Sequence, residues 1–143
     1  MFDSVLVVCE GNICRSPVAA ALLRQCTGKQ VQSAGVAALV GHELDPTARE
    51  VARRQGVDCP PHQARQLTQE MCSGADLILV MEQRQREYLL RIAPESAGKA
   101  LLFGKWLDER EIPDPYRRSR EAYEQVHRVL NEAAVAWAER LGS

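Results

Sequence analysis

The sequence predicts an α/β fold: a single domain over residues 1–143, with a four-stranded parallel sheet flanked by helices on both faces. Short, continuous apolar runs at 4–8 and 77–81 are typical of strands buried on both faces of such a sheet. Helical patterns with capping residues lie between these runs, so strands and helices alternate. A chain of 143 residues is long enough to bury one hydrophobic core.

Apolar runs and capping residues give the order of the elements. The expected strands are residues 4–8, 30–34, 77–81 and 100–103. Ser16 is the expected cap of the first helix, with Pro17 in its first turn. The expected helices run from Ser16 to Gly28, from Asp45 to Gly56, from about Glu82 to Ile92, and from about Ser119 to Leu141.

Charge, hydropathy and cysteine usage argue against nucleic-acid-binding, membrane-inserted and metal-binding proteins. Lys and Arg number 18 against 19 Asp and Glu, which argues against a nucleic-acid binder or a membrane-surface protein. No apolar stretch reaches transmembrane length and no signal-peptide pattern is present, so we expect a cytoplasmic protein without direct membrane insertion. The five cysteines are scattered like free thiols, and no Cys or His cluster has metal-site spacing. We therefore expect neither a metal nor a cofactor.

The segment after the first strand has the composition of a phosphate-binding loop. It places Cys9, five residues and Arg15 between the strand and the first helix. Backbone N–H groups in a tight loop ahead of a helix make an anion-binding nest. Gly11 and Asn12 are residue types that tolerate left-handed backbone, and Arg15 offers a planar fork for two phosphate oxygens. Ligands of parallel sheets bind at this edge, beyond the carboxyl ends of the strands.

The same loop would activate Cys9 as a nucleophile. A helix N-terminus and a guanidinium favour the thiolate, so Cys9 would need no neighbouring general base. The hydroxyl of Ser16 could donate a hydrogen bond to the sulfur and stabilise it as a leaving group. The alternative is that Cys9 is only a buried cysteine at the end of a strand.

The run CEGNICRSP at 9–17 resembles the phosphate loop of the low-molecular-weight protein tyrosine phosphatases. The resemblance covers nearly the whole chain, with further matches at 33–35, 62–66, 76–81 and 114–116. It is most evident for the bacterial branch associated with exopolysaccharide or capsule export, where LFG and EIPDPY recur, here at 102–104 and 111–116. The resemblance implies a four-stranded sheet and a phosphotyrosine protein as substrate. It suggests as partner the cytoplasmic domain of a membrane tyrosine autokinase that controls export.

The resemblance also assigns roles to individual residues. Cys9 would be the nucleophile, Arg15 the phosphate clasp and Asp114 the general acid and base. Asp114 lies between two prolines, which stiffen its loop, although by itself the segment could be a simple turn. Asn12 and Ser33 would support the loop. The substrate would be bound by Glu10, Gly11, Asn12, Ile13, Cys14, Ser16, Leu39 and Tyr116.

Several positions stay open between two interpretations. Cys14 could form a reversible disulfide with Cys9 under oxidation or could simply pack. Glu10 departs from the apolar or small residue that is commoner in the family after the nucleophile. We expect it to point outward at the rim, where it would bias substrate choice. His62 and Arg65 are expected to serve packing and hydrogen bonding, and His42 and His127 to lie on the surface.

Three alternative functions use a similar loop. An arsenate reductase needs two closely spaced relay cysteines, whereas Cys59 and Cys72 are thirteen residues apart. Protein arginine phosphatases of the family carry threonine where this chain has Ile13, and an apolar wall there suits an aromatic ring. A non-hydrolytic phosphocysteine carrier needs neither Arg15 nor the distant segment around Asp114.

Overall fold

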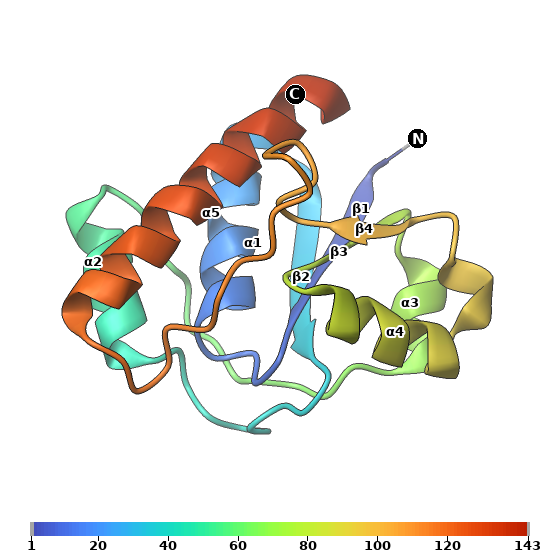
Figure 1. Ribbon diagram of the computed structural model, residues 1–143, viewed down its shortest axis with the longest axis horizontal. Helices are drawn as coiled ribbons and strands as arrows, with labels where there is room; N and C mark the ends of the chain where they lie inside the picture. The colour runs from blue at the N-terminus through green and yellow to red at the C-terminus, as the bar shows by residue number, and fades with distance from the viewer. Residues whose placement is uncertain (1, 143) are drawn as a thin grey trace.

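The central sheet consists of four parallel strands in the order β2-β1-β3-β4, as shown in Figure 1. The computed structural model describes residues 2–142 of the chain. The strands are β1 (Ser4–Cys9), β2 (Gln30–Gly35), β3 (Leu77–Val80) and β4 (Ala100–Leu102). The predicted fold class is confirmed, and each predicted strand lies within one residue of the observed one at either end.

Helices cover both faces of the sheet, as predicted. On one face, α1 (Arg15–Thr27) and α2 (Pro46–Arg54) pack with the long α5 (Arg120–Leu141). On the other face lie the short α3 (Gln69–Gly74), α4 (Gln83–Ile92) and the single turn η1 (Pro94–Ser96). Among the described residues, no helix combines the length and the apolarity needed to cross a bilayer.

The alternation of side chains along β1 explains why its sequence is apolar throughout. Val5 and Val7 point into the core beneath α1 and α5, whereas Leu6 and Val8 point into the core beneath α3 and α4. All four are at most 3% exposed. A strand between two helical layers must be apolar on both faces, and this produces the continuous run in the sequence.

Most helices begin at the side-chain caps that their sequences contain. Asp45 accepts a hydrogen bond from the backbone N–H of Ala48 at the start of α2, and Ser119 accepts one from Ala122 at the start of α5. The first helix differs, because it begins at Arg15 with Cys14 at the cap position and no side-chain cap. The prediction that Ser16 caps α1 is therefore wrong.

The segments that follow β1 and β2 run side by side at the edge of the sheet where ligands bind. Backbone N–H groups of Val36, Ala37 and Leu39, in the segment after β2, donate to the carbonyls of residues 9, 10 and 11, in the loop after β1. Gly35 permits the close approach, because a Cβ there would lie 2.5 Å from the carbonyl oxygen of Glu10. The same hydrogen bonds bring Leu39 to the mouth of the pocket described next.

Candidate active site

The loop between β1 and α1 forms the floor of a pocket at the carboxyl edge of the sheet. The pocket is lined by Cys9, Glu10, Gly11, Ile13, Cys14, Arg15, Ala37, Leu39, Asp114 and Tyr116. The structure thus brings together the three residues predicted to be catalytic and most of those predicted to bind substrate. Asn12 and Ser16 do not line the pocket but lie behind the loop, and Ala37 was not predicted.

Arg15 is buried, with its guanidinium only partly satisfied. The residue is 1% exposed, and its Nη1 donates to the carbonyl oxygen of Ile112 at 2.7 Å. Within residues 2–142, Nε and Nη2 are buried without a hydrogen-bond partner. A buried charged donor without a partner is costly, and native proteins keep such groups mainly where a ligand satisfies them. Two neighbouring N–H donors of one guanidinium match two oxygens of a phosphoryl group.

The backbone of the loop supplies further donors. In the described part of the chain, the N–H groups of residues 10–14 donate no hydrogen bond to another protein group. Asn12 has a φ of 60°, whereas Gly11 does not have a positive φ, so the left-handed backbone predicted for both residues occurs only at Asn12. An asparagine tolerates this conformation because its short side chain can hydrogen-bond locally.

Hydrogen bonds hold the Asn12 side chain in one orientation. Its Oδ1 accepts from the backbone N–H of Arg65 at 2.9 Å, which identifies the other side-chain atom as the NH₂ group. That group donates to the hydroxyl oxygens of Ser33 at 3.0 Å and Ser16 at 2.8 Å. Asn12 and Ser33 therefore form the hydrogen bond that was predicted to support the loop.

The same network includes a hydrogen bond to the predicted nucleophile. Ser16 Oγ lies 2.9 Å from Cys9 Sγ. The hydroxyl oxygen accepts from Asn12, and its single hydrogen is available to the sulfur, which can only accept when Cys9 is a thiolate. Ser16 is thus placed to donate to the Cys9 thiolate, and its hydroxyl is used there and not to cap the helix that it was predicted to cap.

His62 and Arg65 were predicted to serve packing and hydrogen bonding, and both form hydrogen bonds behind the loop. His62 Nε2 donates to the carbonyl oxygen of Asn12 at 2.6 Å. Arg65 Nε donates to the carbonyl oxygen of Ser33 at 2.9 Å. Burial lowers the pKa of His62, although its bond to Asn12 partly opposes that effect. Neither side chain lines the pocket.

The segment after β4 carries Asp114 to the opposite wall. Ile112 anchors this segment, because its N–H donates to Met81 O at 3.0 Å while its carbonyl accepts from Arg15. Asp114 Oδ1 accepts from the backbone N–H of Tyr116 at 3.0 Å, and Oδ2 lies 3.7 Å from Arg15 Nη2. One carboxylate oxygen is therefore held by the loop while the other faces the pocket.

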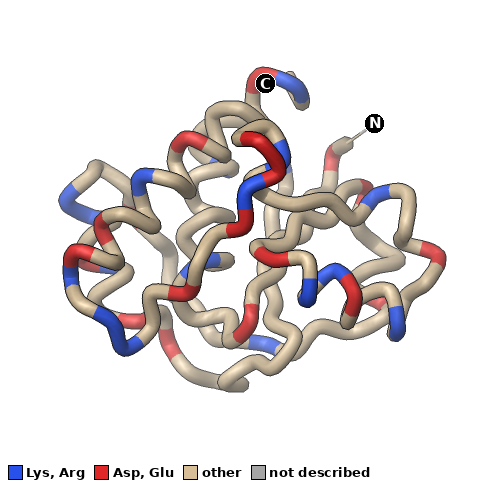
Figure 2. The backbone as a smooth tube through the Cα atoms, in the orientation of Figure 1, with Lys and Arg blue, Asp and Glu red and all other residues tan. Residues whose placement is uncertain are grey.

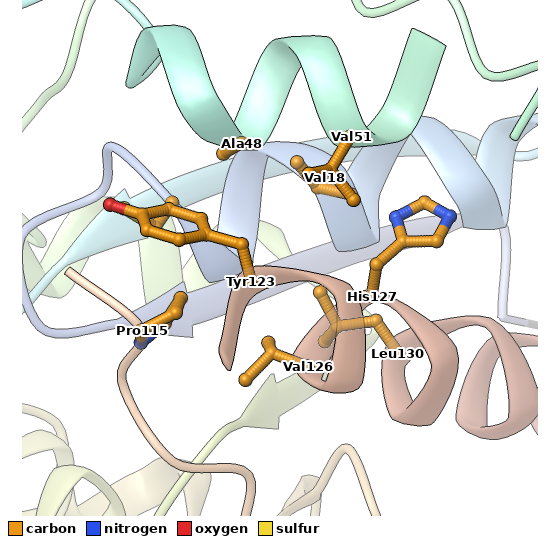
Figure 3. A pocket seen from close by; sticks show the side chains of 9 residues that line it. Val18, Ala48, Val51, Pro115, Tyr123, Val126, His127 and Leu130 are labelled. Atoms are coloured by element: carbon orange, nitrogen blue, oxygen red, sulfur yellow. The ribbon is translucent and has the colours of Figure 1, made fainter. Parts of the chain in front are cut away.

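Cys14 lies between the pocket and a second, apolar crevice. This crevice lies between α1, α2 and α5 and is shown in Figure 3. Burial raises the pKa of the Cys14 thiol far above its ordinary value, and the carboxylates of Asp45 and Asp114 add to the effect. Cys14 therefore stays a neutral thiol at neutral pH. A nucleophilic cysteine reacts as a thiolate, so Cys14 is not suited to be a second nucleophile.

His127 lies in the same crevice and not on the surface, which corrects the sequence prediction. The residue is 6% exposed, and Figure 3 shows its ring extending from α5 toward α2, beside Val51. No described residue hydrogen-bonds to its Nδ1. Burial lowers the pKa of His127, so the imidazole is neutral in the folded protein at neutral pH.

The two buried histidines predict how stability depends on pH. Both His62 and His127 have a lower pKa in the folded state than the ordinary value of about 6.5 expected after unfolding. Below that value the unfolded chain binds more protons than the folded one, so the free energy of unfolding should fall as pH is lowered from 7 to 5. Urea denaturation at pH 7, 6 and 5 would measure how the free energy of unfolding changes with pH.

The variant His127→Gln should make this change smaller. The control is His42→Gln, at an exposed histidine, which should show the same change as wild type. If both variants showed the same change with pH, burial of His127 would not be its cause.

Cys59 and Cys72, the two cysteines that were compared with the relay cysteines of an arsenate reductase, lie on opposite sides of the sheet. Cys59 packs against the core beneath α1 and α5, and Cys72 is fully buried in the core beneath α3 and α4. The sheet separates these two cores, so the arrangement does not resemble a thiol relay. Among residues 2–142, no group of three or more His, Cys, Asp or Glu side chains is placed to hold a metal ion.

Besides Ala37, two further site residues were not found by sequence reasoning. Glu82 Oε1 lies 3.5 Å from Arg15 Nη1, and Arg84 contacts both Glu82 and Glu10. Glu82 follows β3 closely, so the rule that ligands bind at the carboxyl edge of a parallel sheet could have identified it. Arg84 gives no comparable signal, because its partner Glu10 is 74 residues away in the sequence.

Comparison with known proteins places this architecture in one family. A family model described as low molecular weight phosphotyrosine protein phosphatase matches residues 4–143. The chain is 51% identical to the low molecular weight protein-tyrosine-phosphatase Etp of Escherichia coli strain K12, over 98% of this chain and 95% of that protein. The structure of Vibrio vulnificus Wzb in complex with benzylphosphonate has a TM-score of 0.96 and 48% identity, over 98% of this chain and 99% of that one.

A second solved structure agrees. The tyrosine phosphatase Wzb from Escherichia coli K30 in complex with sulphate has a TM-score of 0.96 and 50% identity, over 99% of this chain and all of that one. Family model, sequence identity and fold therefore agree over almost the full length. The chain belongs to the low-molecular-weight protein-tyrosine-phosphatase family.

Proposed function

We propose that this tyrosine phosphatase works through a phosphocysteine intermediate on Cys9, with Arg15 as phosphate clasp and Asp114 as general acid and base. The observation that carries the proposal is the pair of buried, unpartnered N–H donors of Arg15, in the same pocket as Cys9 and Asp114. A phosphoryl group bound by those donors lies between a sulfur nucleophile and a carboxyl group. Sulphate in a relative's structure is an oxyanion of similar shape, which supports this assignment.

The first chemical step transfers the phosphoryl group to the enzyme. The thiolate of Cys9 attacks phosphorus as the bond from phosphorus to the phenolic oxygen breaks. The protonated carboxyl of Asp114 gives its proton to the departing oxygen, so the product is a neutral tyrosine side chain. Arg15 and the loop N–H groups stabilise the charge on the equatorial oxygens.

The second step regenerates the enzyme. The Asp114 carboxylate takes a proton from a water molecule as the water oxygen attacks phosphorus. The bond between phosphorus and sulfur breaks, inorganic phosphate is released, and the sulfur leaves as a thiolate. The oriented hydroxyl of Ser16 donates a hydrogen bond to that thiolate and so stabilises the leaving group.

The walls of the pocket fit an aromatic leaving group. Ile13 and Leu39 are apolar, and Tyr116 presents an aromatic ring, so the space above the loop suits the ring of phosphotyrosine. Val40, the neighbour of Leu39, is 67% exposed and does not line the pocket. Benzylphosphonate, bound to a relative, carries both an aromatic ring and a phosphonate, which supports a ligand of this class.

Replacing Asp114 by asparagine should slow substrates according to how much their leaving group needs a proton. For an alkyl or unactivated phenyl phosphate, we expect kcat/KM to fall about 10²-fold or more, the usual size for general acid catalysis. For a dinitrophenyl phosphate, whose leaving group departs as a stable anion, the loss in kcat/KM should be much smaller. The measurement is kcat/KM over a series of aryl phosphates, because this quantity reports the first step and not the second step that all substrates share.

The control for this experiment is Glu111→Gln. Glu111 is a neighbouring carboxylate whose Oε2 accepts from the backbone N–H of Gln83, and it does not line the pocket. Its replacement should leave the dependence on leaving group unchanged. An equal loss for all leaving groups in Asp114→Asn would contradict the assignment of the acid.

We further propose that the chain acts in the cytoplasm on the phosphorylated cytoplasmic domain of a membrane tyrosine autokinase that controls exopolysaccharide export. This rests on the resemblance at 102–104 and 111–116 and on the tyrosine-phosphatase relatives. The Cys9→Ser variant should retain phosphotyrosine binding without turnover. When immobilised, this variant should therefore capture the phosphorylated kinase from a cell extract. Release by vanadate is the control, because vanadate competes for the same loop. Capture of no tyrosine-phosphorylated kinase would remove the support for this partner.

A further inference from the structure

A chain of ion pairs joins the rim of the pocket to its phosphate-binding arginine. Arg84, in the first turn of α4, donates through Nη1 to Glu10 Oε1 at 2.7 Å, and its Nη2 forms an ion pair with Glu82 Oε1 at 2.8 Å. The same Glu82 oxygen lies 3.5 Å from Arg15 Nη1. In Figure 2, acidic and basic residues adjoin one another where β3 leads into α4. One surface arginine thus links the carboxylate beside the nucleophile to the carboxylate beside the clasp.

The negative charge of Glu10 would disfavour both the Cys9 thiolate and a bound phosphate unless a cation neutralises it. It follows Cys9 directly and lines the pocket, with its side chain 33% exposed. Both the thiolate and the phosphate dianion of the substrate are negative, so a free carboxylate at this place would repel both. Arg84 is the only cation within the described chain that forms an ion pair with Glu10.

The other groups around the pocket do not offset Glu10. Asp114 and Glu82 are carboxylates that face Arg15 from two sides, and Arg15 is the cation that must bind the phosphate. Removing Arg84 therefore leaves Glu10 without a cationic partner, beside a guanidinium that two other carboxylates already face. The remaining titratable groups that line the pocket are the Cys14 thiol, the Tyr116 phenol and Cys9 itself.

The ion pair between Arg84 and Glu10 contributes little to the stability of the fold. The Arg84 side chain is 57% exposed, and an ion pair this exposed contributes little to folding. Glu82 is held independently of Arg84, because it forms the capping box of α4 with Gln85. The loss of Arg84 should therefore act mainly through the charge that it leaves on Glu10.

We propose that Arg84 is a positioning residue for the phosphatase reaction, which neutralises Glu10 and so keeps the pocket receptive to the substrate dianion and to the Cys9 thiolate. The inference rests on the proposed function of Cys9. It goes beyond that function because Arg84 does not line the pocket and acts mainly through Glu10.

The test is a double-mutant cycle between Arg84→Ala and Glu10→Gln. In the wild-type background, Arg84→Ala should lower kcat/KM about threefold to tenfold, mainly through KM; this is the size expected for one uncompensated charge near the substrate in a partly solvated site. The midpoint of Cys9 alkylation against pH should move upward. In the Glu10→Gln background the same substitution should change kcat/KM less than about twofold, because the charge that it would expose is gone.

Two further variants make the result decisive. Arg84→Lys keeps the positive charge and should recover most of the activity lost in Arg84→Ala. Arg91→Ala removes a positive charge from the same helix, where Arg91 stacks on Tyr88 away from the pocket, and should leave both measurements unchanged. Equal losses for Arg84→Ala in both backgrounds would overturn the inference. A wild-type enzyme that forms no phosphocysteine would instead refute the proposed function, so the two failures are distinguishable.

Discussion

Replacing Cys9 by serine is expected to reduce turnover by about 10⁴-fold or more while leaving the fold intact. A serine hydroxyl is not ionised at neutral pH, and the pocket offers no histidine to deprotonate it; the nearby imidazole of His62 instead donates to a backbone carbonyl behind the loop. The substituted oxygen is smaller than sulfur, so it fits the same space at the end of β1. Turnover of an aryl phosphate, measured with circular dichroism on the same sample, would check both parts of the prediction.

A matched control for Cys9→Ser is Cys72→Ser, at a cysteine on the far side of the sheet. It should retain full activity per folded molecule, although its stability should fall because the thiol is buried in an apolar core. Residual activity of Cys9→Ser within about tenfold of wild type would contradict a covalent role for Cys9.

Arg15→Lys should reduce kcat/KM about 10²–10³-fold, the usual size for removing a charged donor that faces the transition state. A lysine retains the charge but has a single nitrogen, which cannot bind two phosphoryl oxygens and also donate to the carbonyl of Ile112. That carbonyl anchors the segment that carries Asp114, so the general acid should also lose part of its alignment. The kinetics of Arg15→Lys with a small aryl phosphate would measure the combined loss.

The prediction for Arg15 has its own control. Arg24 is a second arginine of α1, exposed to solvent; its guanidinium donates to the carbonyl of Val31, and it does not line the pocket. Arg24→Lys should affect stability more than kcat/KM. If Arg15→Lys retained nearly full activity, two-point recognition of the phosphoryl group by a guanidinium would not operate in this enzyme.

The fold could be predicted from the sequence because its signals are local. Strands buried on both faces give continuous apolar runs, and Asp45 and Ser119 cap α2 and α5 as their sequences indicate. The start of α1 was misplaced because Ser16 has the sequence context of a cap, whereas its hydroxyl is used by Cys9 and Asn12. A contact made in the folded protein overrides the local preference.

The candidate site could be predicted only where one short segment contains it. The loop from Cys9 to Arg15 is contiguous, so residue types and spacing point to an anion site. The contacts of Glu82 and Arg84 depend on how β3 and α4 pack beside β1, which the sequence does not state locally. His127 was also misplaced, although it lies four residues after Tyr123 and three before Leu130, on the buried face of α5.

We propose that free loop amides and the guanidinium of Arg15 keep Cys9 as a thiolate beside a bound oxyanion. The direct measurement is the rate of Cys9 alkylation by iodoacetamide between pH 4 and 9, followed by mass spectrometry, with and without inorganic phosphate. The account predicts a rate that has already reached its plateau at neutral pH and that phosphate lowers strongly. A rate that rises through about pH 8.5 like an ordinary thiol, with no protection by phosphate, would contradict it.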